Sequence, residues 1–276
     1  MRSDNGTRYE LEGALTEIVR HIYGIRMKED ADTVVYHLSP SLEMVLVFNF
    51  GPALSFSFGE EEIAEQQVER IGIIGPMRKM LNYELKPGTD LLTLPFVNDG
   101  FFRFMKLSTN NVDLSDEDSV AEYADNLNTL WEEMNALPAT ELRVELLKEY
   151  LAKAAKEGED AVQPLLENAS AFFDPVLSPS KVIAEKAAIT ERAVQMRFKK
   201  YVGYSPKELL RYLRFKQVVA YLMAERGKPV DWFDLIVQFG YHDQSHLIRD
   251  FKFYTGGTPT QFLEINDSGD FCTSRD

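Results

Sequence analysis

The sequence predicts an α+β protein: an amino-terminal, mostly-β barrel or sandwich with flanking helices, then an all-α carboxy-terminal domain. Its 276 residues are room for roughly two domains of 100–200 residues each. Charge also divides the chain. Residues 1–170 carry 15 Lys and Arg against 31 Asp and Glu, a net charge of −16, whereas residues 171–265 carry 14 against 10, a net charge of +4. This contrast indicates two domains with different partners.

Composition excludes several classes of protein. The chain is 45% hydrophobic and 27% charged, which is typical of a globular protein and excludes a disordered one. No apolar run approaches the roughly 18 residues of a membrane helix, and the polar start leads into no apolar signal core. Cys272 is the single cysteine, so no disulfide framework, zinc knuckle or cysteine nucleophile is expected. These features favour a cytoplasmic protein with no membrane partner.

Residues 8–112 are predicted to form the β-rich domain. An opening helix is expected over residues 9–23, where apolar side chains have helical spacing. Short strands follow, bounded by turns such as Gly51-Pro52 and Asn98-Asp99-Gly100. The predicted strands are residues 34–38, 44–50, 54–58, 71–74, 91–96 and 101–107. Short strands at this spacing are typical of a barrel or sandwich.

Residues 113–170 are predicted to form a helical connector. Apolar stripes predict helices over residues 122–137 and 141–153, and Pro164 marks the first turn of a third, short helix. The two longer helices have two interpretations, which are pairing across a dimer and packing against their own domain. Residues 174–180 are interpreted as a linker. Residues 266–276 are expected to form a flexible tail.

An internal repeat organises the carboxy-terminal domain, residues 171–265. Residues 198–210 align with residues 251–263 at an offset of 53, and Phe, Lys, Tyr, Gly, Pro and the final Leu are identical. Gly203 and Gly256 can take the left-handed conformation that ends a helix. Each is followed by a capping box with proline at the first helical position. Two equivalent helices therefore stop, turn and restart in the same way.

A short helix and a tight turn precede each copy of the repeat. The predicted helices are 182–187 and 190–201 in the first pair, and 232–239 and 243–254 in the second. Ala188-Ile189 and Gly240-Tyr241 form the turns, and Thr190 and Asp243 are the expected N-caps. This is the helix-turn-helix arrangement, in which one helix enters the DNA major groove, and a long helix over residues 206–223 would hold two such units apart. Capped helix pairs also occur in plain bundles.

Exposed polar side chains favour DNA binding over a plain bundle. Arg, Gln and Ser read base edges, and Lys and Arg grip phosphates. The second helix of the first pair offers Glu191, Arg192, Gln195, Lys199 and Lys200. The second helix of the second pair offers Gln244, Ser245, His246, Arg249 and Lys252. Double-stranded DNA is therefore the predicted partner.

Several motifs in the carboxy-terminal third carry a resemblance to a known family. They are residues 190–198, Gly203-Tyr204-Ser205-Pro206 and above all residues 240–247, with Phe251-Lys252 and Gly256-x-Thr258-Pro259. In combination, residues 173–265 resemble the AraC/XylS transcription regulators. The resemblance implies a sequence-specific DNA-binding regulator whose two helix-turn-helix units enter successive major grooves on one face of the DNA.

The resemblance also implies the site residues. Arg192, Gln195 and Met196 take the base-facing positions of the first unit, and Gln244, Ser245, His246 and Arg249 those of the second. The full set of candidate DNA-binding residues is Thr190, Glu191, Arg192, Gln195, Met196, Lys199, Lys200, His242, Gln244, Ser245, His246, Arg249 and Lys252. The chain departs from the family at Ala188, where glycine is usual, at Ile236, where a small alanine is usual, and at Met196, where arginine is common. These departures leave the base preference of the first unit unpredictable.

The amino-terminal domain has a regulatory interpretation by the same resemblance, which implies effector binding, dimerisation or both. Residues 38–51 with Gly75-Pro76 resemble, more weakly, an uncharacterised all-β regulatory domain of some members. Aromatic residues at strand spacing either line a pocket or, more often, pack a core. They are Phe56, Phe58, Phe96, Phe101, Phe102 and Phe104. A small-molecule effector, RNA polymerase and a second copy of the chain are the further candidate partners, and the effector-binding residues are unknown.

The sequence offers no catalytic constellation. His21 and His37 lack carboxylate or cysteine partners at a metal-like spacing, and His242 falls in the turn before the helix that carries His246. Alkyl-transfer repair proteins share this DNA-binding module but need reactive cysteines, which Cys272 alone does not supply. No enzyme activity, catalytic residue, metal or cofactor is therefore expected. The alternative function is a non-catalytic interaction protein whose helical module is only a scaffold.

Overall fold

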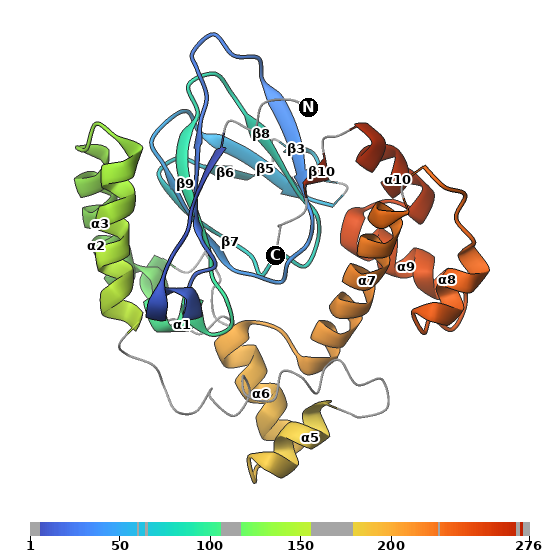
Figure 1. The fold of residues 1–276 in the computed structure, drawn as a ribbon. Coiled ribbons are helices and arrows are strands. Elements are labelled where there is room, and N and C mark those ends of the chain that lie inside the picture. The colour runs from blue at the N-terminus through green and yellow to red at the C-terminus, as the bar shows by residue number, and fades with distance from the viewer. Residues whose placement is uncertain are drawn as a thin grey trace.

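The computed structural model describes residues 6–59, 61–63, 66–105, 117–155, 179–225, 227–268 and 271–272 (Figure 1). Its strands are β1 (Gly6–Tyr9), β2 (Ile22–Arg26), β3 (Val34–Leu38), β4 (Val45–Asn49), β5 (Leu54–Phe58), β6 (Gln66–Val68), β7 (Ile71–Ile74), β8 (Leu81–Leu85), β9 (Asp90–Pro95) and β10 (Phe271–Cys272). Its helices are the 3₁₀ helix η1 (Gly13–Glu17), α1 (Gly100–Met105), α2 (Glu117–Asn135), α3 (Thr140–Ala155), α5 (Pro179–Lys186), α6 (Glu191–Val202), α7 (Pro206–Ala224), α8 (Trp232–Gln238), α9 (Gln244–Thr255) and α10 (Pro259–Ser268). None of the described helices is long and apolar enough to cross a membrane.

Two five-stranded sheets form the amino-terminal domain. One has the strand order β1-β2-β9-β4-β7, and the other has the order β10-β3-β8-β5-β6. Buried side chains from both sheets, among them Val47 of β4, Phe56 of β5 and Leu85 of β8, form one core between the sheets. No strand pairing joins the two sheets within the described residues. The predicted mostly-β domain is therefore confirmed as a sandwich, and no barrel closes.

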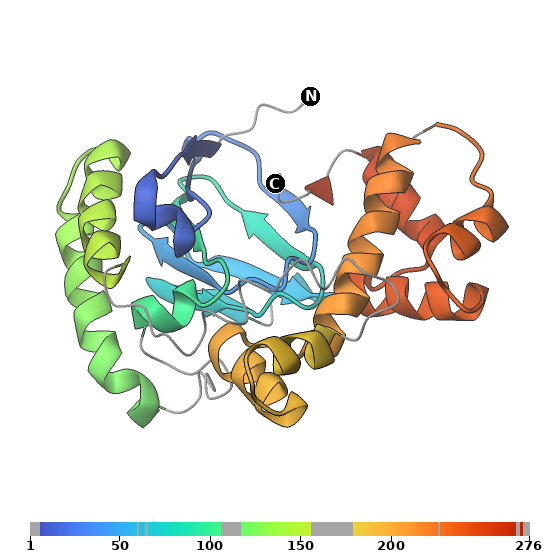
Figure 2. The ribbon, with the colours of Figure 1, turned by 60° about the horizontal axis from the view of Figure 1, so that its bottom comes forward.

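Helices α2 and α3 form a third layer on the side opposite the helices α7 to α10 (Figures 1 and 2). Successive residues of a strand point to opposite faces, so Val47 of β4 faces the other sheet whereas Phe48 packs with Leu147 of α3. The indole nitrogen of Trp131 donates a hydrogen bond to the carbonyl oxygen of Asn49 at 2.8 Å. These helices thus pack against their own domain, which was one of the two interpretations.

The predicted opening helix over residues 9–23 is wrong. β1 and β2 form an antiparallel pair in which Tyr9 lies opposite Ile22, and η1 lies between them. Gly13 at the start of η1 has φ +59°, outside the helical region. Ile18 and Ile22 are fully buried. The apparent helical spacing arises because a 3₁₀ turn and a strand face the same core.

The predicted strand over residues 101–107 is also wrong, since α1 occupies Gly100–Met105. The N–H of Arg103 donates to the carbonyl oxygen of Asp99 at 2.9 Å and helps to close the first turn. Phe101 is buried in the core under α2 and α3, and Phe102 is buried in a core of the carboxy-terminal domain. Adjacent aromatic residues are buried on both sides because α1 lies between two cores.

Some strands have no counterpart in the sequence prediction. These are β1, β2, β6, β8 and β10. The tail predicted to be flexible contains β10, which pairs in parallel with β3 and places Phe271 opposite His37. The predicted short helix at Pro164 lies outside the described residues, as does most of the predicted linker. Pro179 and Ser180 of that linker belong to α5.

The carboxy-terminal domain consists of α5 to α10, as the sequence predicts. Two apolar cores hold it together. Ile183 of α5 and Val194 of α6 lie in the first, and Phe215 of α7, Leu235 of α8 and Phe251 of α9 lie in the second. Helix α7 runs from one core to the other (Figure 2).

Candidate nucleic-acid interface

The carboxy-terminal domain contains two helix-turn-helix units. The first unit, residues 179–203, comprises α5 and α6, and the second unit, residues 231–256, comprises α8 and α9. Helices α6 and α9 occupy the positions of recognition helices, since each is the second helix of its unit. Both are 12 residues long.

Matching backbone hydrogen bonds close the two turns. In the first unit the N–H of Ile189 donates to the carbonyl oxygen of Ala184 at 3.0 Å. In the second unit the N–H of Tyr241 donates to the carbonyl oxygen of Ile236 at 2.9 Å. The turns at Ala188-Ile189 and Gly240-Tyr241 are thereby confirmed.

The residue at the centre of each turn has a left-handed backbone. φ is +52° at Ala188 and +65° at Gly240. Glycine takes this conformation readily, whereas a residue with a Cβ is strained in it. The departure from glycine at Ala188 therefore places strain in the turn of the first unit.

Side-chain caps start both recognition helices. The Thr190 hydroxyl accepts a hydrogen bond from the N–H of Ala193 at 3.1 Å, and the Asp243 carboxylate accepts one from the N–H of His246 at 2.7 Å. The backbone hydrogen bond from His246 lowers the pKa of Asp243, because it stabilises the charged carboxylate. Both predicted N-caps are confirmed.

The ends of the recognition helices also match. Gly203 follows α6 with φ +85°, and Gly256 follows α9 with φ +81°. Ser205 and Glu208 then form a reciprocal capping box at the start of α7. Thr258 and Gln261 exchange the equivalent hydrogen bonds at 2.8 and 3.3 Å at the start of α10. The predicted repeat of stop, turn and restart is present in both units.

The units differ by one residue between turn and cap. Ala188 corresponds to Gly240 at an offset of 52, whereas Thr190 corresponds to Asp243 at an offset of 53. His242 is the additional residue in the second unit. Its side chain is 89% exposed, and its Nδ1 lies 3.1 Å from a carboxylate oxygen of Asp243. An imidazole therefore projects beside the amino-terminal end of α9 with no counterpart in the first unit.

Nearly all the candidate DNA-binding residues are exposed. His246 is partly buried, and its ring packs edge-on against Tyr241 with centroids 5.0 Å apart. Met196 is 63% exposed, which is unusual for a large apolar side chain.

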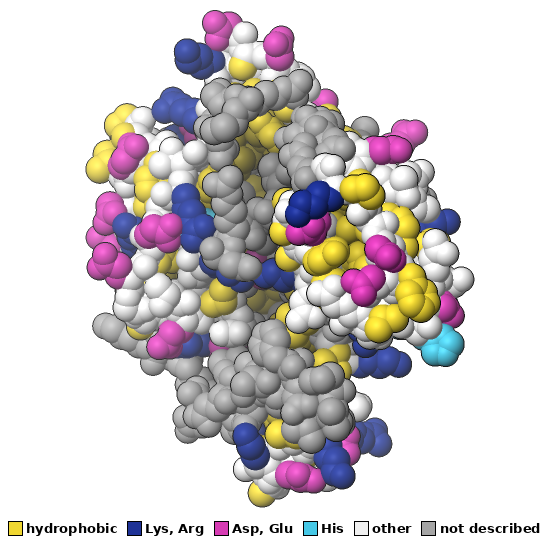
Figure 3. Space-filling model, turned by 45° about the vertical axis from the view of Figure 1, so that its right-hand side comes forward, with side chains coloured by type: hydrophobic (Ala, Val, Ile, Leu, Met, Phe, Trp, Pro, Cys, Tyr) yellow, Lys and Arg dark blue, Asp and Glu magenta, His cyan; other side chains and the backbone are white. Residues whose placement is uncertain are grey.

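Exposed apolar side chains also gather on the face formed by α7 to α10 (Figure 3). Phe233 and Val237 of α8 are 77% and 64% exposed.

Two candidate cations are held by neighbouring groups. The ammonium of Lys200 donates to the Tyr201 hydroxyl at 3.2 Å and lies 5.5 Å from the centre of the Phe102 ring. The Nε of Arg249 donates to the carbonyl oxygen of Ser245 at 3.1 Å. Contact with DNA would have to compete with these interactions.

The offset of 53 relates corresponding positions of the two recognition helices. Met196 corresponds to Arg249, Lys199 to Lys252, and Arg197 to Asp250. Asp250 is 1% exposed, and its carboxylate accepts a hydrogen bond from Arg211 of α7 at 2.7 Å. The outer faces therefore differ at Met196, and the inner faces differ at Asp250.

The amino-terminal domain packs against both units. Phe102 of α1 lies in the core of the first unit, edge-on to Tyr201 with ring centroids 4.8 Å apart. Leu42 and Met80 lie in the core of the second unit, and the N–H of Met80 donates to the carbonyl oxygen of Tyr254 at 2.6 Å. Each recognition helix thus rests partly on side chains from the other domain.

Arg78 of the β domain lies at the junction between α6 and α7. Its guanidinium donates to the carbonyl oxygen of Gly203 and pairs with Glu208 at 3.0 Å. Burial alone would raise the pKa of Glu208, but hydrogen bonds from Ser205 and the charge of Arg78 lower it overall. The loop after β7 therefore contacts the helix joint that sets the first unit on α7.

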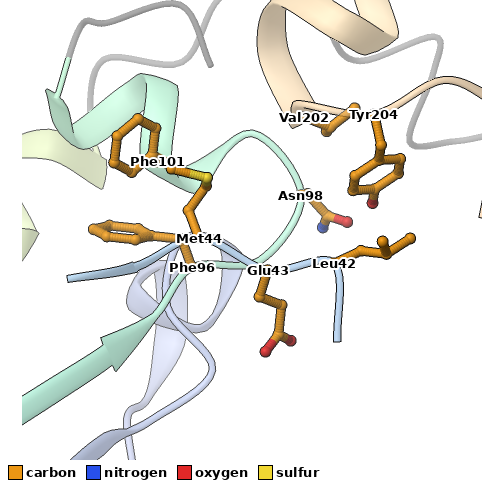
Figure 4. Close-up of a pocket in the computed structure, with 8 residues that line it drawn as sticks. All are labelled: Leu42, Glu43, Met44, Phe96, Asn98, Phe101, Val202 and Tyr204. Carbon is orange, nitrogen blue, oxygen red and sulfur yellow. The ribbon is translucent and has the colours of Figure 1, made fainter. Parts of the chain in front are cut away.

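A small cavity lies between the two domains (Figure 4). Its volume of about 20 Å³ is enough for about one water molecule. Two lining residues, Leu42 and Asn98, have left-handed φ values of +58° and +51°. Burial raises the pKa of Tyr204, another lining residue, to about 12, and the charge of Glu43 adds to the shift. Small-molecule sites usually enclose about 300–1,000 Å³, so the cavity does not accommodate an effector of ordinary size in this arrangement.

Several residues at the interface and the domain junction escaped the sequence prediction. Arg78, Met80 and Leu42 had no local signal, because their partners lie more than a hundred residues away. For Phe102 the sequence predicts only a place in a pocket or in a core. Asp250 lies between the exposed candidates Arg249 and Lys252 on α9. Its position in the helical repeat is the signal that could have placed it on the inner face.

Comparison with known proteins agrees with this geometry. Residues 183–265 match a family model described as a helix-turn-helix domain. The regulatory protein HrpB of Ralstonia nicotianae is 26% identical over 84 residues, which are 30% of this chain and 18% of that protein. The chain thus matches less than a fifth of the length of this relative.

Three solved structures show a distant likeness to this chain. ToxT from Vibrio cholerae is 12% identical with a TM-score of 0.38, covering 88% of this chain and 96% of ToxT. ToxT bound to (E)-4-(8-methylnaphthalen-1-yl)but-3-enoic acid is 11% identical with a TM-score of 0.40, covering 95% and 99%. The AraC-like activator CuxR is 12% identical with a TM-score of 0.24, covering 75% and 78%. The matched segment and the paired, capped units show that residues 183–265 form a helix-turn-helix domain, whose motifs resemble those of the AraC/XylS regulators.

Proposed function

We propose that the chain is a sequence-specific DNA-binding transcription regulator. The observation that carries the proposal is the duplicated unit, in which two recognition helices of equal length are capped in the same way and expose polar and basic side chains. A plain helical bundle does not need two such outer faces. The mild positive charge of residues 171–265, set against the acidic amino-terminal part, also favours contact with DNA through this domain.

The exposed residues divide into two proposed roles. Base reading falls to Arg192 and Gln195 on α6 and to Gln244, Ser245 and Arg249 on α9. Phosphate contact falls to Lys199, Lys200 and Lys252, near the carboxyl ends of the same helices. The proposed surface also includes Thr190, Glu191, Met196, His242 and His246. The two helices would read patches about one helical turn of DNA apart, roughly 10 base pairs.

Regulation is proposed to act through the junction between the domains. Phe102, Arg78 and Met80 connect the β domain to both units, so a shift of one domain would change how the recognition helices are held. The junction cavity holds about one water molecule, and a small-molecule effector there would have to bind a more open arrangement and shift the population toward it. A second copy of the chain and RNA polymerase remain proposed partners.

A footprint of the purified protein on bound genomic fragments tests the DNA-binding function. We expect protection over two adjacent major grooves and an affinity that falls steeply between about 50 and 200 mM salt, because phosphate neutralisation releases counterions. A protein that binds no DNA at low salt would instead be the interaction scaffold. Arg249→Ala and Lys252→Ala separate the two proposed roles. The arginine variant should lose affinity mainly for the specific site, and the lysine variant about equally for all sequences.

A further inference from the structure

A buried carboxylate lies on the inner face of the second recognition helix. Asp250 is 1% exposed, although it directly follows the exposed Arg249 on α9. One carboxylate oxygen accepts a hydrogen bond from the Nε of Arg211 at 2.7 Å. The Arg211 guanidinium also lies 4.3 Å from the centre of the Phe253 ring. Helix α9 is thereby attached to α7 by a charged pair as well as by apolar packing.

Apolar contacts bury the inner face of α9 but supply no directional bond. Leu247 and Phe251 are fully buried against the second core, but hydrophobic burial has no directional preference. A charge-assisted hydrogen bond has a preferred distance and direction. The Arg211–Asp250 pair is therefore a directional contact between side chains that can help to select one rotation of the helix about its axis.

A second contact connects this pair to the outer face. The other carboxylate oxygen of Asp250 and the Tyr241 hydroxyl are both buried, and among the described residues neither makes a hydrogen bond of standard geometry, although the two side chains interact with each other. Burial, and then the charge of Asp250, raises the pKa of Tyr241. The Tyr241 ring packs edge-on against His246, a candidate DNA contact. A displacement of Asp250 would therefore shift Tyr241, which lies in the turn, and His246, which packs against Tyr241.

The energetics argue against stability as the main role of the pair. An ion pair with one partner fully buried is weak evidence for stability, because desolvation offsets the attraction, and apolar replacements of both partners are often neutral or stabilising. The first unit folds with Arg197 at the corresponding position and no buried carboxylate there. The fold of a unit therefore does not require an acid at this position.

We propose that Asp250 and Arg211 are positioning residues that set the rotation of α9 and thereby determine which bases Arg249, Ser245 and Gln244 reach. This inference rests on the proposed DNA-binding function. It predicts that removing the pair changes base preference at the patch read by α9 while the patch read by α6 stays the same.

The double variant Arg211→Met with Asp250→Leu tests this, because it removes the charges and keeps apolar volume. Selection of bound sequences from a random DNA pool should show relaxed preference at the α9 patch only. The ratio of specific to random-sequence affinity should fall about tenfold, with random-sequence affinity unchanged. Thermal unfolding should show a melting temperature close to that of the wild-type protein.

The matched control is another ionic pair, remote from the recognition helices. Arg143 and Asp90 of the amino-terminal part pair at 3.0 Å with side chains 10% and 16% exposed. The double variant Arg143→Met with Asp90→Leu should keep the wild-type base preference. Arg211→Lys is the second test variant, because it keeps the charge and removes the guanidinium geometry. We expect Arg211→Lys to show the same relaxed preference, and it supplies the test if the double variant fails to fold.

The outcomes separate this inference from the proposed function. A wild-type protein that selects no sequence overturns the DNA-binding function and this inference with it. A wild-type preference that the folded Arg211 variants retain overturns the inference alone. Equal loss at both patches would also contradict it, since that result indicates general destabilisation.

Discussion

The two helix-turn-helix units share a backbone plan but support their recognition helices differently. In the first unit, a small core that includes Val194 and Phe198 is completed by Phe102 from the β-rich domain. In the second unit, a larger core packs against the inner face of α9, and Arg211 adds a charged contact to that face. The repeat specifies turns and caps. The contacts on the inner face of each recognition helix come instead from residues outside the repeat, Phe102 for α6 and Arg211 for α9.

This difference indicates that the units can be perturbed separately. The apolar core of the first unit includes Phe102 from the β-rich domain, and the unit carries a strained alanine in its turn. The second unit has an unstrained glycine in its turn and more apolar contacts of its own. Variants in the cores and turns of the two units, and at Met196 and Arg249, should therefore have unequal or opposite effects.

Phe102→Ala should have the largest effect. The side chain is 8% exposed, and its removal leaves a cavity beside Tyr201 that should cost about 3–5 kcal/mol of stability. Hydrogen exchange should accelerate in α5 and α6 before α8 and α9, and urea unfolding should show the loss. Phe233→Ala is the control, because that ring is 77% exposed and its loss should change stability by less than about 0.5 kcal/mol. Equal acceleration in both units would contradict separate support.

Exchange of residues between the outer faces should alter DNA binding in opposite directions. Arg249→Met should cost about 1–3 kcal/mol at the specific site by removing a base contact. Met196→Arg, at the corresponding exposed position of α6, should strengthen binding because it adds a cation facing the DNA. Fluorescence anisotropy titrations on specific and random duplexes measure both effects. Unchanged binding by the folded Met196→Arg variant would show that this position faces away from DNA.

Reciprocal changes in the turns should alter stability with opposite signs. Gly240→Ala forces a residue with a Cβ into φ +65°, and Ala188→Gly relieves the strain at φ +52°. Each change should be worth about 1 kcal/mol, after the opposing effect on the unfolded chain is included. Apart from the adjoining residues, no atom of the described chain lies within 4 Å of a Cβ built at Gly240, so the substitution tests the backbone conformation alone. Melting temperatures that move in the same direction would contradict the assignment of these turns.

Removal of one proposed phosphate contact should have the smallest effect. Lys199 and Lys252 occupy corresponding positions. Replacing either with alanine should lower the slope of log binding constant against log salt concentration by about one. Lys200→Ala should lower it less, since the Lys200 ammonium already lies against Tyr201 and Phe102. The slopes come from titrations at several salt concentrations. An equal slope for wild-type protein and all three variants would exclude these phosphate contacts.

Local signals made most of the carboxy-terminal domain predictable. Thr190, Asp243 and Ser205 each cap a helix within three residues of themselves, and Gly203 and Gly256 end helices through their own backbone. Such short-range chemistry is readable from sequence. The exposed candidate residues were predictable too, because they alternate with buried positions at helical spacing.

Long-range packing accounts for the failures. Apolar spacing over residues 9–23 suggested a helix, but β2 pairs with β9 far along the chain and takes Ile22 into a sheet. Phe101 and Phe102 suggested a strand, because the sequence does not reveal that α1 has a core on either side. The bond between Arg78 and Glu208 spans 130 residues and leaves no local trace. Asp250 has its partner 39 residues away, on α7.

Strand β10 covers an edge of the second sheet with a segment that follows the helical domain. It follows α10 and lies along β3, at what would otherwise be an edge of the second sheet. An uncovered edge strand presents a row of unpaired backbone groups that can pair with another chain. Movement of the helical domain away from the sandwich would pull on this short cover and could expose β3. Separation of the domains would then leave β3 as an open edge with unpaired backbone groups.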